Sequence, residues 1–121
     1  MAFQCILPAG GFAVRLGEIA AKLPKGLLPM GNQTVMDHIY MRLCELPSLK
    51  EICIVTNDKF YNHYAEWAKS AFNKKIINVI SDGGTDAKNA RGANYGVWYG
   101  IEKMGWQKED ILIMGSYNFL P

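Results

Sequence analysis

Residues 8–16 read PAGGFAVRL and directly follow the apolar run at residues 3–7. Two adjacent glycines after a buried strand allow a tight turn and bring backbone N–H groups close to an anion. Arg15 lies within this stretch and Lys25 lies beyond it, so both add positive charge. These features indicate a phosphate-binding loop at the end of a strand. The same residues also fit an ordinary strand-to-loop turn with a solvated arginine.

Two common phosphate-binding motifs do not match this stretch. No Gly-Lys-Ser or Gly-Lys-Thr follows the glycines at the spacing of a P-loop. Ala13 and Val14 stand where the dinucleotide-binding fingerprint needs further glycines. The glycine pair therefore indicates an anion site without identifying its ligand.

Apolar runs alternate with helical periodicity along the rest of the chain. Short runs rich in β-branched residues predict strands at residues 3–7, 51–56, 75–80 and 110–114. Capping residues and apolar spacing predict helices from Asn32 or Thr34 to about Leu46, from Asn57 or Asp58 to Phe72, and from about Asn89 or Arg91 to Lys103. Residues 11–29 are expected to form a long binding loop with one helical turn at residues 16–21.

This alternation predicts a single three-layer α/β domain over residues 1–121, with a Rossmann-like, mainly parallel sheet of about four strands. If the first three strands wind outward and the fourth returns beside the first, the strand order is 3-2-1-4. The first and fourth strands then flank a switch point, where open α/β sheets bind ligands. Periodicity alone does not fix this order.

The helical spacing also predicts which side chains face the sheet. For the first helix these are Val35, His38, Ile39, Arg42 and Leu43, for the second Phe60, Tyr64, Trp67, Ala68 and Ala71, and for the third Tyr95, Trp98, Ile101 and residues 102–104. The aromatic residues of the second helix are expected to pack in the core rather than to form a stacking surface.

Composition excludes several classes of function. The net charge is +2 and the basic residues are dispersed, so no nucleic-acid-binding surface is expected. No apolar run is long enough for a membrane span, and the amino end does not resemble a secretion signal, so a cytoplasmic protein is expected. The 3 cysteines are widely spaced in apolar surroundings, which favours reduced, buried thiols.

Three segments resemble the sugar-phosphate nucleotidylyltransferases. Residues 8–29, PAGGFAVRLGEIAAKLPKGLLP, are similar to their signature L-A-G-G-x-G-T-R-L followed by P-K-x-L-x-P, with Ala13 and Val14 in place of Gly and Thr. Residues 80–96, ISDGGTDAKNARGANYG, resemble the family's N-D-G-T and L-G-A segments. Residues 110–119, DILIMGSYNF, resemble its strand that ends in Gly-Asp-Asn. The likeness covers nearly the whole chain and implies the strand order 3-2-1-4.

The resemblance also implies an activity. These enzymes join a nucleoside triphosphate to a sugar 1-phosphate or similar phosphate and release pyrophosphate, usually with Mg²⁺. It implies that Arg15 holds the leaving pyrophosphate and that Lys25 contacts the attacked phosphate. The remaining nucleotide-binding positions that it implies are Ala9, Gly10, Gly11, Asp82, Gly83 and Gly92. Members of the family are commonly about twice as long, so the chain is expected to match their amino-terminal half, in truncated form.

Ser116 departs from the family pattern. It occupies the position of the magnesium-binding aspartate, and a neutral hydroxyl is a poor ligand for this hard cation. Weak or absent turnover is therefore expected. Two alternatives to an enzyme remain: a non-catalytic module that binds a nucleotide or sugar nucleotide, and a ligand-free α/β domain that self-associates. In each case a homodimer or larger homo-oligomer is expected, because a half-length domain exposes apolar surface.

Overall fold

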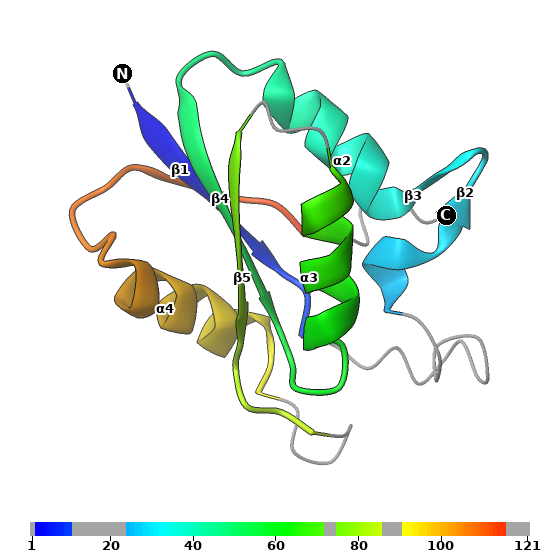
Figure 1. Cartoon of the computed structure of the whole chain (residues 1–121). Helices are drawn as coiled ribbons and strands as arrows, with labels where there is room; N and C mark the ends of the chain where they lie inside the picture. The colour runs from blue at the N-terminus through cyan, green and yellow to red at the C-terminus, as the bar shows by residue number, and fades with distance from the viewer. Residues whose placement is uncertain (1, 11–23, 72–74, 86–90, 116–121) are drawn as a thin grey trace.

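The computed structural model describes residues 2–10, 24–71, 75–85 and 91–115 (Figure 1). Its main sheet has 4 strands in the order β5-β4-β1-β6. The strands are β1 (Phe3–Pro8), β4 (Leu49–Thr56), β5 (Ile76–Ser81) and β6 (Ile111–Ile113). Every neighbouring pair is parallel. Counted along the chain, these are the third, second, first and fourth strands of the sheet, so the predicted order is confirmed.

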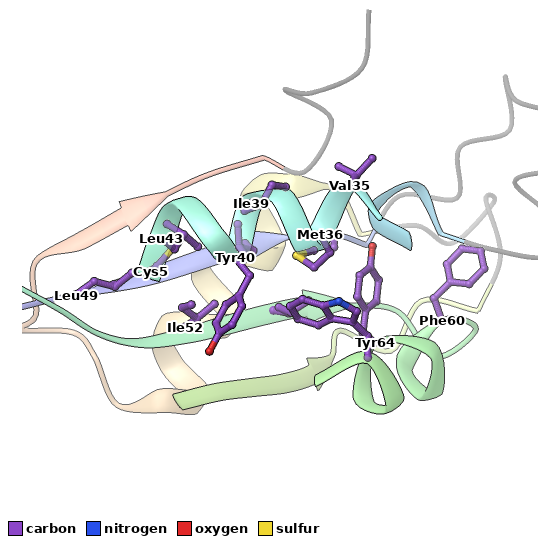
Figure 2. Close-up of a cluster of buried hydrophobic side chains, with 14 residues drawn as sticks. Cys5, Val35, Met36, Ile39, Tyr40, Leu43, Leu49, Ile52, Phe60 and Tyr64 are labelled. Carbon is purple, nitrogen blue, oxygen red and sulfur yellow. The ribbon is translucent and has the colours of Figure 1, made fainter. Parts of the chain in front are cut away.

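Helices cover both faces of the sheet, which confirms the three-layer architecture. Helices α2 (Val35–Cys44) and α3 (Tyr61–Ser70) cover one face, and α4 (Ala93–Met104) covers the other (Figure 1). The larger core lies under α2 and α3, where aliphatic side chains of α2 and the aromatic rings of Tyr64 and Trp67 on α3 meet apolar side chains of β1 and β4 (Figure 2). The smaller core lies under α4 and is formed by Ile6, Cys53, Val55 and Trp106. No helix in the described part of the chain is both long and apolar enough to cross a membrane.

The start of α2 is fixed by a capping box. The Thr34 hydroxyl accepts from the Asp37 backbone N–H at 3.1 Å, and the Asp37 carboxylate accepts from the Thr34 N–H at 2.8 Å. Asp37 also accepts from the Trp67 indole N–H at 2.8 Å, which joins α2 to α3. Burial acts to raise the pKa of Asp37, but these hydrogen bonds from Thr34 and Trp67 outweigh it and hold the pKa below its ordinary value.

The segment predicted as one long loop contains short regular elements at its end. A 3₁₀ turn, η2, covers Lys25–Leu27, and β2 (Pro29–Met30) pairs with β3 (Gln33–Thr34) in an antiparallel sheet of 2 strands. Gly31 makes the intervening turn with a φ of 74°, a conformation that favours glycine. Two-residue strands leave almost no periodic pattern, so the sequence did not reveal them. The predicted helical turn at residues 16–21 lies outside the described residues.

Helix α3 begins later than predicted, because residues 58–60 form a turn, and it ends at Ser70, because the backbone of Ala71 is extended. The Asn57 side-chain oxygen accepts from the Phe60 N–H at 2.9 Å and so caps this turn rather than the helix itself.

In α2, Arg42 is exposed, and His38 is half-buried with its Nε2 donating to the Met30 carbonyl at 3.0 Å. The prediction that Arg42 faces the sheet was therefore wrong.

The predicted inner face of α4 is confirmed for Ile101 and Met104, which pack against the smaller core, and wrong for Trp98. Trp98 is 55% exposed, whereas Gly96 and Gly100 are the buried residues of this helix. A Cβ atom at Gly100 would lie 3.0 Å from Val55 Cγ2 and 3.2 Å from Ile6 Cδ1. The helix therefore approaches the sheet along its glycines, which leaves no room for an aromatic ring on that side. Apolar spacing missed this because glycine adds little to a hydrophobic stripe.

Candidate functional site

The carboxyl ends of β1, β4 and β5 lie beside one another at one edge of the sheet. The chain leaves β1 at Ala9 and Gly10, β4 at Asn57 and β5 at Asp82. In open α/β sheets this edge is where ligands bind. Segments that are distant in the sequence are therefore brought together where a site is expected.

Side chains at the end of β4 hold the backbone of Ala9 and Gly10. The Thr56 hydroxyl donates to the Ala9 carbonyl at 2.9 Å, and the Asn57 amide donates to the Gly10 carbonyl at 2.9 Å. Thr56 and Asn57 are both 0% exposed, so these hydrogen bonds are shielded from water. The first glycine of the predicted phosphate loop thus has a fixed position. Sequence reasoning assigned Thr56 and Asn57 only to a strand end and a cap, although polar residues directly after a buried strand were a usable signal.

Asp82 lies directly against Gly10. A Cβ atom at Gly10 would be 2.8 Å from Asp82 Oδ2, so only glycine fits at position 10 with the carboxyl group in this place. The other carboxyl oxygen, Oδ1, accepts from the Gly84 N–H at 2.8 Å, and the Asp82 N–H donates to the Thr56 carbonyl at 2.8 Å. Asp82 is only 5% exposed. The packing of Asp82 against Gly10 is the closest link between the two predicted halves of the site.

Burial raises the pKa of the Asp82 carboxyl above its ordinary value. The Gly84 N–H and the positive charge of Arg91 act in the opposite direction, while the negative charge of Asp58 adds to the rise. An aspartate whose pKa is shifted by burial at the ligand-binding edge of a sheet is a candidate functional residue.

The loop after β5 is folded tightly by short-range hydrogen bonds. Gly83 has a φ of 90°, and its N–H donates to the Ser81 hydroxyl at 3.2 Å. The Ser81 hydroxyl also donates to the Asp58 carboxylate, and the Asp58 N–H donates to the Gly84 carbonyl at 2.8 Å. Substitution of Gly83 would therefore strain the backbone at the point where the loop passes Asp82.

Arg91 joins this loop to the start of α4. Its Nη2 lies 3.7 Å from the place of a Cβ atom on Gly83, and its Cζ lies 5.5 Å from the centroid of the Tyr95 ring. Gly92, the next residue, precedes α4 with a φ of 87° and is exposed. The sequence pattern pointed to Gly92 but not to Arg91, because a single basic residue beside a glycine is not a distinctive signal.

The structure brings together Ala9, Gly10, Asp82 and Gly83 from the predicted set. For Lys25 it places the backbone, in η2, and describes nothing of the side chain. Gly11, Arg15 and Ser116 lie outside the described residues. Gly115 follows β6, and the Met114 N–H donates to the Ile6 carbonyl at 3.1 Å, so the fourth strand ends beside the first. Among the residues that the structure describes, no three His, Cys, Asp or Glu side chains gather as metal ligands.

Comparison with known proteins identifies relatives. A family model described as the MobA-like NTP transferase domain matches residues 5–114. The chain is 33% identical over 90 residues to 2-C-methyl-D-erythritol 4-phosphate cytidylyltransferase of Colwellia psychrerythraea, an alignment covering 73% of this chain and 33% of that protein.

Solved structures share the fold. A UDP-glucose pyrophosphorylase complexed with UDP-glucose matches with a TM-score of 0.76 and 16% identity, covering 96% of this chain and 46% of that one. A UTP-bound UGPase from Acinetobacter baumannii matches with a TM-score of 0.73 and 12% identity over the same shares of the two chains. The chain thus spans one third of the curated relative and just under half of these structures.

Proposed function

The chain belongs to the family of MobA-like NTP transferase domains, and from this premise we propose that it binds a nucleoside triphosphate at the carboxyl edge of its sheet. The observation that best supports the proposal is the packing of the buried Asp82 carboxyl against Gly10, at 2.8 Å from the place of an absent Cβ atom. This packing joins the loop that resembles a phosphate site to the loop that resembles a nucleobase site.

Each part of the proposed site has a physical role. Backbone N–H groups of Gly10 and Gly11 approach the phosphates, because glycine leaves no side chain in the way. Arg15 binds the pyrophosphate portion, since its planar guanidinium meets two oxygens at once, and Lys25 contacts the α-phosphate. Ala9, Asp82, Gly83 and Gly92 border the nucleobase.

The relatives suggest the substrate class. One is named as a cytidylyltransferase and another is described with bound UTP, so CTP and UTP are the first nucleotides to test. The reaction of the class would be attack by a phosphate oxygen of a sugar 1-phosphate or similar acceptor on the α-phosphorus. The bond from the α-phosphorus to the bridging oxygen breaks as the new bond forms, and pyrophosphate leaves with its electron pair.

The donor set fits magnesium poorly. Position 116 offers a serine hydroxyl instead of a carboxylate, and the described residues contain no cluster of three acidic, histidine or cysteine side chains. We therefore propose that this chain binds nucleotide with little dependence on Mg²⁺ and turns over weakly at most. The same features favour the second candidate, a non-catalytic module for a nucleotide or sugar nucleotide. We also propose that the domain forms a homodimer or larger homo-oligomer.

Calorimetric titration with CTP and UTP tests the binding site. Arg15→Ala removes a charge-assisted hydrogen bond worth about 1.5–3 kcal/mol, so affinity should fall roughly tenfold to a hundredfold. Lys108→Ala is the control, because it removes the same charge from an exposed position at the opposite edge of the sheet. Unchanged affinity in Arg15→Ala would reject the phosphate site. If the wild type binds neither nucleotide, the alternative of a ligand-free α/β domain is the one that remains.

The same titrations with and without Mg²⁺ test the metal position. Ser116→Asp should strengthen Mg²⁺-dependent binding, because it adds an anionic oxygen ligand. Robust Mg²⁺-dependent release of pyrophosphate by the unmodified chain would contradict the proposed impairment.

A further inference from the structure

The turn that contains Lys25 rests on a buried tyrosine of α3. Tyr64 is 1% exposed, and a Cβ atom at Gly26 would lie 2.6 Å from its hydroxyl oxygen. The same Cβ atom would be 3.1 Å from Met36 Cε and 3.1 Å from Tyr64 Cε1. Only glycine therefore allows the backbone next to Lys25 to lie directly on the tyrosine. In Figure 2 the Tyr64 side chain extends from α3 toward Met36 at the start of α2.

The contact is polar as well as steric. Burial raises the pKa of the Tyr64 phenol, so the group is a neutral hydroxyl, and the Gly26 backbone is hydrogen bonded to it. In this interior position no water competes for the bond. The hydroxyl thus fixes one backbone point of the turn.

Further contacts leave the turn little freedom. The Leu27 N–H donates to the Pro24 carbonyl at 3.0 Å, which closes the 3₁₀ turn around Lys25 and Gly26. The Val35 N–H donates to the Leu28 carbonyl at 3.1 Å and attaches the end of this segment to α2. Leu27 also packs against the larger core. Among the described contacts of Gly26, the hydroxyl of Tyr64 is the one nearest to the place of a Cβ atom.

We propose that Tyr64 is a positioning residue that holds the 24–28 turn so that Lys25 meets the phosphates of the bound nucleotide. This inference rests on the proposed function. A lysine is a flexible point charge, so the placement of its backbone decides which phosphate it can reach. Tyr64 acts through Gly26 and touches no substrate itself.

Tyr64→Phe separates this role from core packing, because phenylalanine keeps the ring and removes only the hydroxyl. With UTP and CTP as probes, affinity should fall about fivefold, the effect of one hydrogen bond of about 1 kcal/mol. Affinity for uridine, which has no phosphates, should not change. Tyr40→Phe is the matched control, because its buried hydroxyl is bonded to the Lys75 backbone at 3.1 and 3.2 Å, just before β5 and away from η2.

A double-mutant cycle links Tyr64 to the lysine. In a Lys25→Ala background, Tyr64→Phe should cost no further UTP affinity, because the side chain that it positions is gone. Equal losses in both backgrounds would show that Tyr64 does not act through Lys25 and would overturn the inference. An equal loss in Tyr40→Phe would do the same, because it would indicate a general effect on the fold.

Size rescue tests the contact without any ligand. Gly26→Ala should lower the thermal midpoint, and adding Tyr64→Phe should recover part of the loss by removing the atom 2.6 Å from the new Cβ. Hydrogen exchange should show a protected Gly26 amide in the wild type and faster exchange in Tyr64→Phe. Additive midpoints with unchanged Gly26 exchange would overturn the inference. If the wild type binds neither UTP nor CTP, the proposed function is rejected, and with it the role of Tyr64 in phosphate binding. The hydrogen-exchange and size-rescue measurements would still test the contact between Tyr64 and Gly26.

Discussion

At the scale of single residues, Asp82 lies at the proposed site, and burial of its carboxyl group makes the ionised form unfavourable in the folded state. Its carboxyl group is buried against Gly10 and receives one hydrogen bond from Gly84. Because burial raises its pKa, the folded state holds this proton more tightly than the unfolded chain does. Its contribution to stability is therefore most favourable at low pH, and it decreases as the pH rises from the ordinary aspartate value through the raised one.

Asp82→Asn should remove this pH dependence. Asparagine keeps the oxygen that accepts from Gly84 and does not ionise, so the variant should gain stability relative to the wild type as the pH rises through the weakly acidic range. Urea unfolding at several pH values from about 4 to about 7 measures the difference. Glu66→Gln, at an exposed position on α3, is the control. Parallel stability curves for wild type and Asp82→Asn would contradict the burial effect.

At the scale of elements, α4 shows how two glycines on one helix face differ. A Cβ atom at Gly96 would make an ordinary contact of 3.6 Å with Val55 Cγ1. At Gly100 it would lie 3.0 Å from Val55 and 3.2 Å from Ile6, both of which are buried and β-branched. Such side chains have few alternative rotamers and cannot move aside easily.

Gly96→Ala and Gly100→Ala should therefore change stability in opposite directions. Gly96→Ala should stabilise the fold by about 0.5–1 kcal/mol, because alanine is the better helix former. Gly100→Ala should destabilise it by about 1 kcal/mol, because overpacking costs about 1–3 kcal/mol and exceeds the helix gain. Denaturant unfolding of the two variants provides the comparison, and each serves as the control for the other. A stabilising Gly100→Ala would show that α4 can move away from the sheet.

At the scale of the whole molecule, the sheet has apolar side chains at its two outer strands. Ile76 on β5 is 60% exposed and Ile113 on β6 is 53% exposed. Within the described residues, no further strand pairs with the outer edge of β5 or β6. Phe3, Ile111 and Leu112 also line a shallow, mainly apolar hollow beside Asp110. Open, apolar sheet edges favour association with a second copy of the chain.

We expect a dimer or larger assembly in light scattering at tens of micromolar protein. Ile113→Lys should shift the mass toward the monomer, because a charged edge strand resists pairing. Ile76→Lys places the same charge on the opposite strand, and so distinguishes β6 from β5 as the contact. A wild type that is strictly monomeric at this concentration would refute self-association.

The sequence by itself determined the strands, the helices and the family of this protein. Apolar runs marked all four strands of the main sheet, since strands buried on both faces need apolar side chains throughout. The capping chemistry of Asn32 or Thr34 marked the start of α2, and the structure has Thr34 as the cap. The motifs at residues 8–29 and 80–96 indicated the nucleotidyltransferases and, through them, the strand order. These features depend on local chemistry or on a linear motif, which the sequence displays directly.

Only the tertiary structure decided how segments distant in the sequence meet. The fit of Asp82 against Gly10, the support of Gly26 by Tyr64 and the approach of Gly100 to Val55 each require a glycine opposite a particular side chain. In the sequence these glycines indicate only flexible turns or weak helix positions. Glycine is required where an added Cβ atom would lie within about 3 Å of a side chain from another segment. Close packing in the folded interior sets that distance.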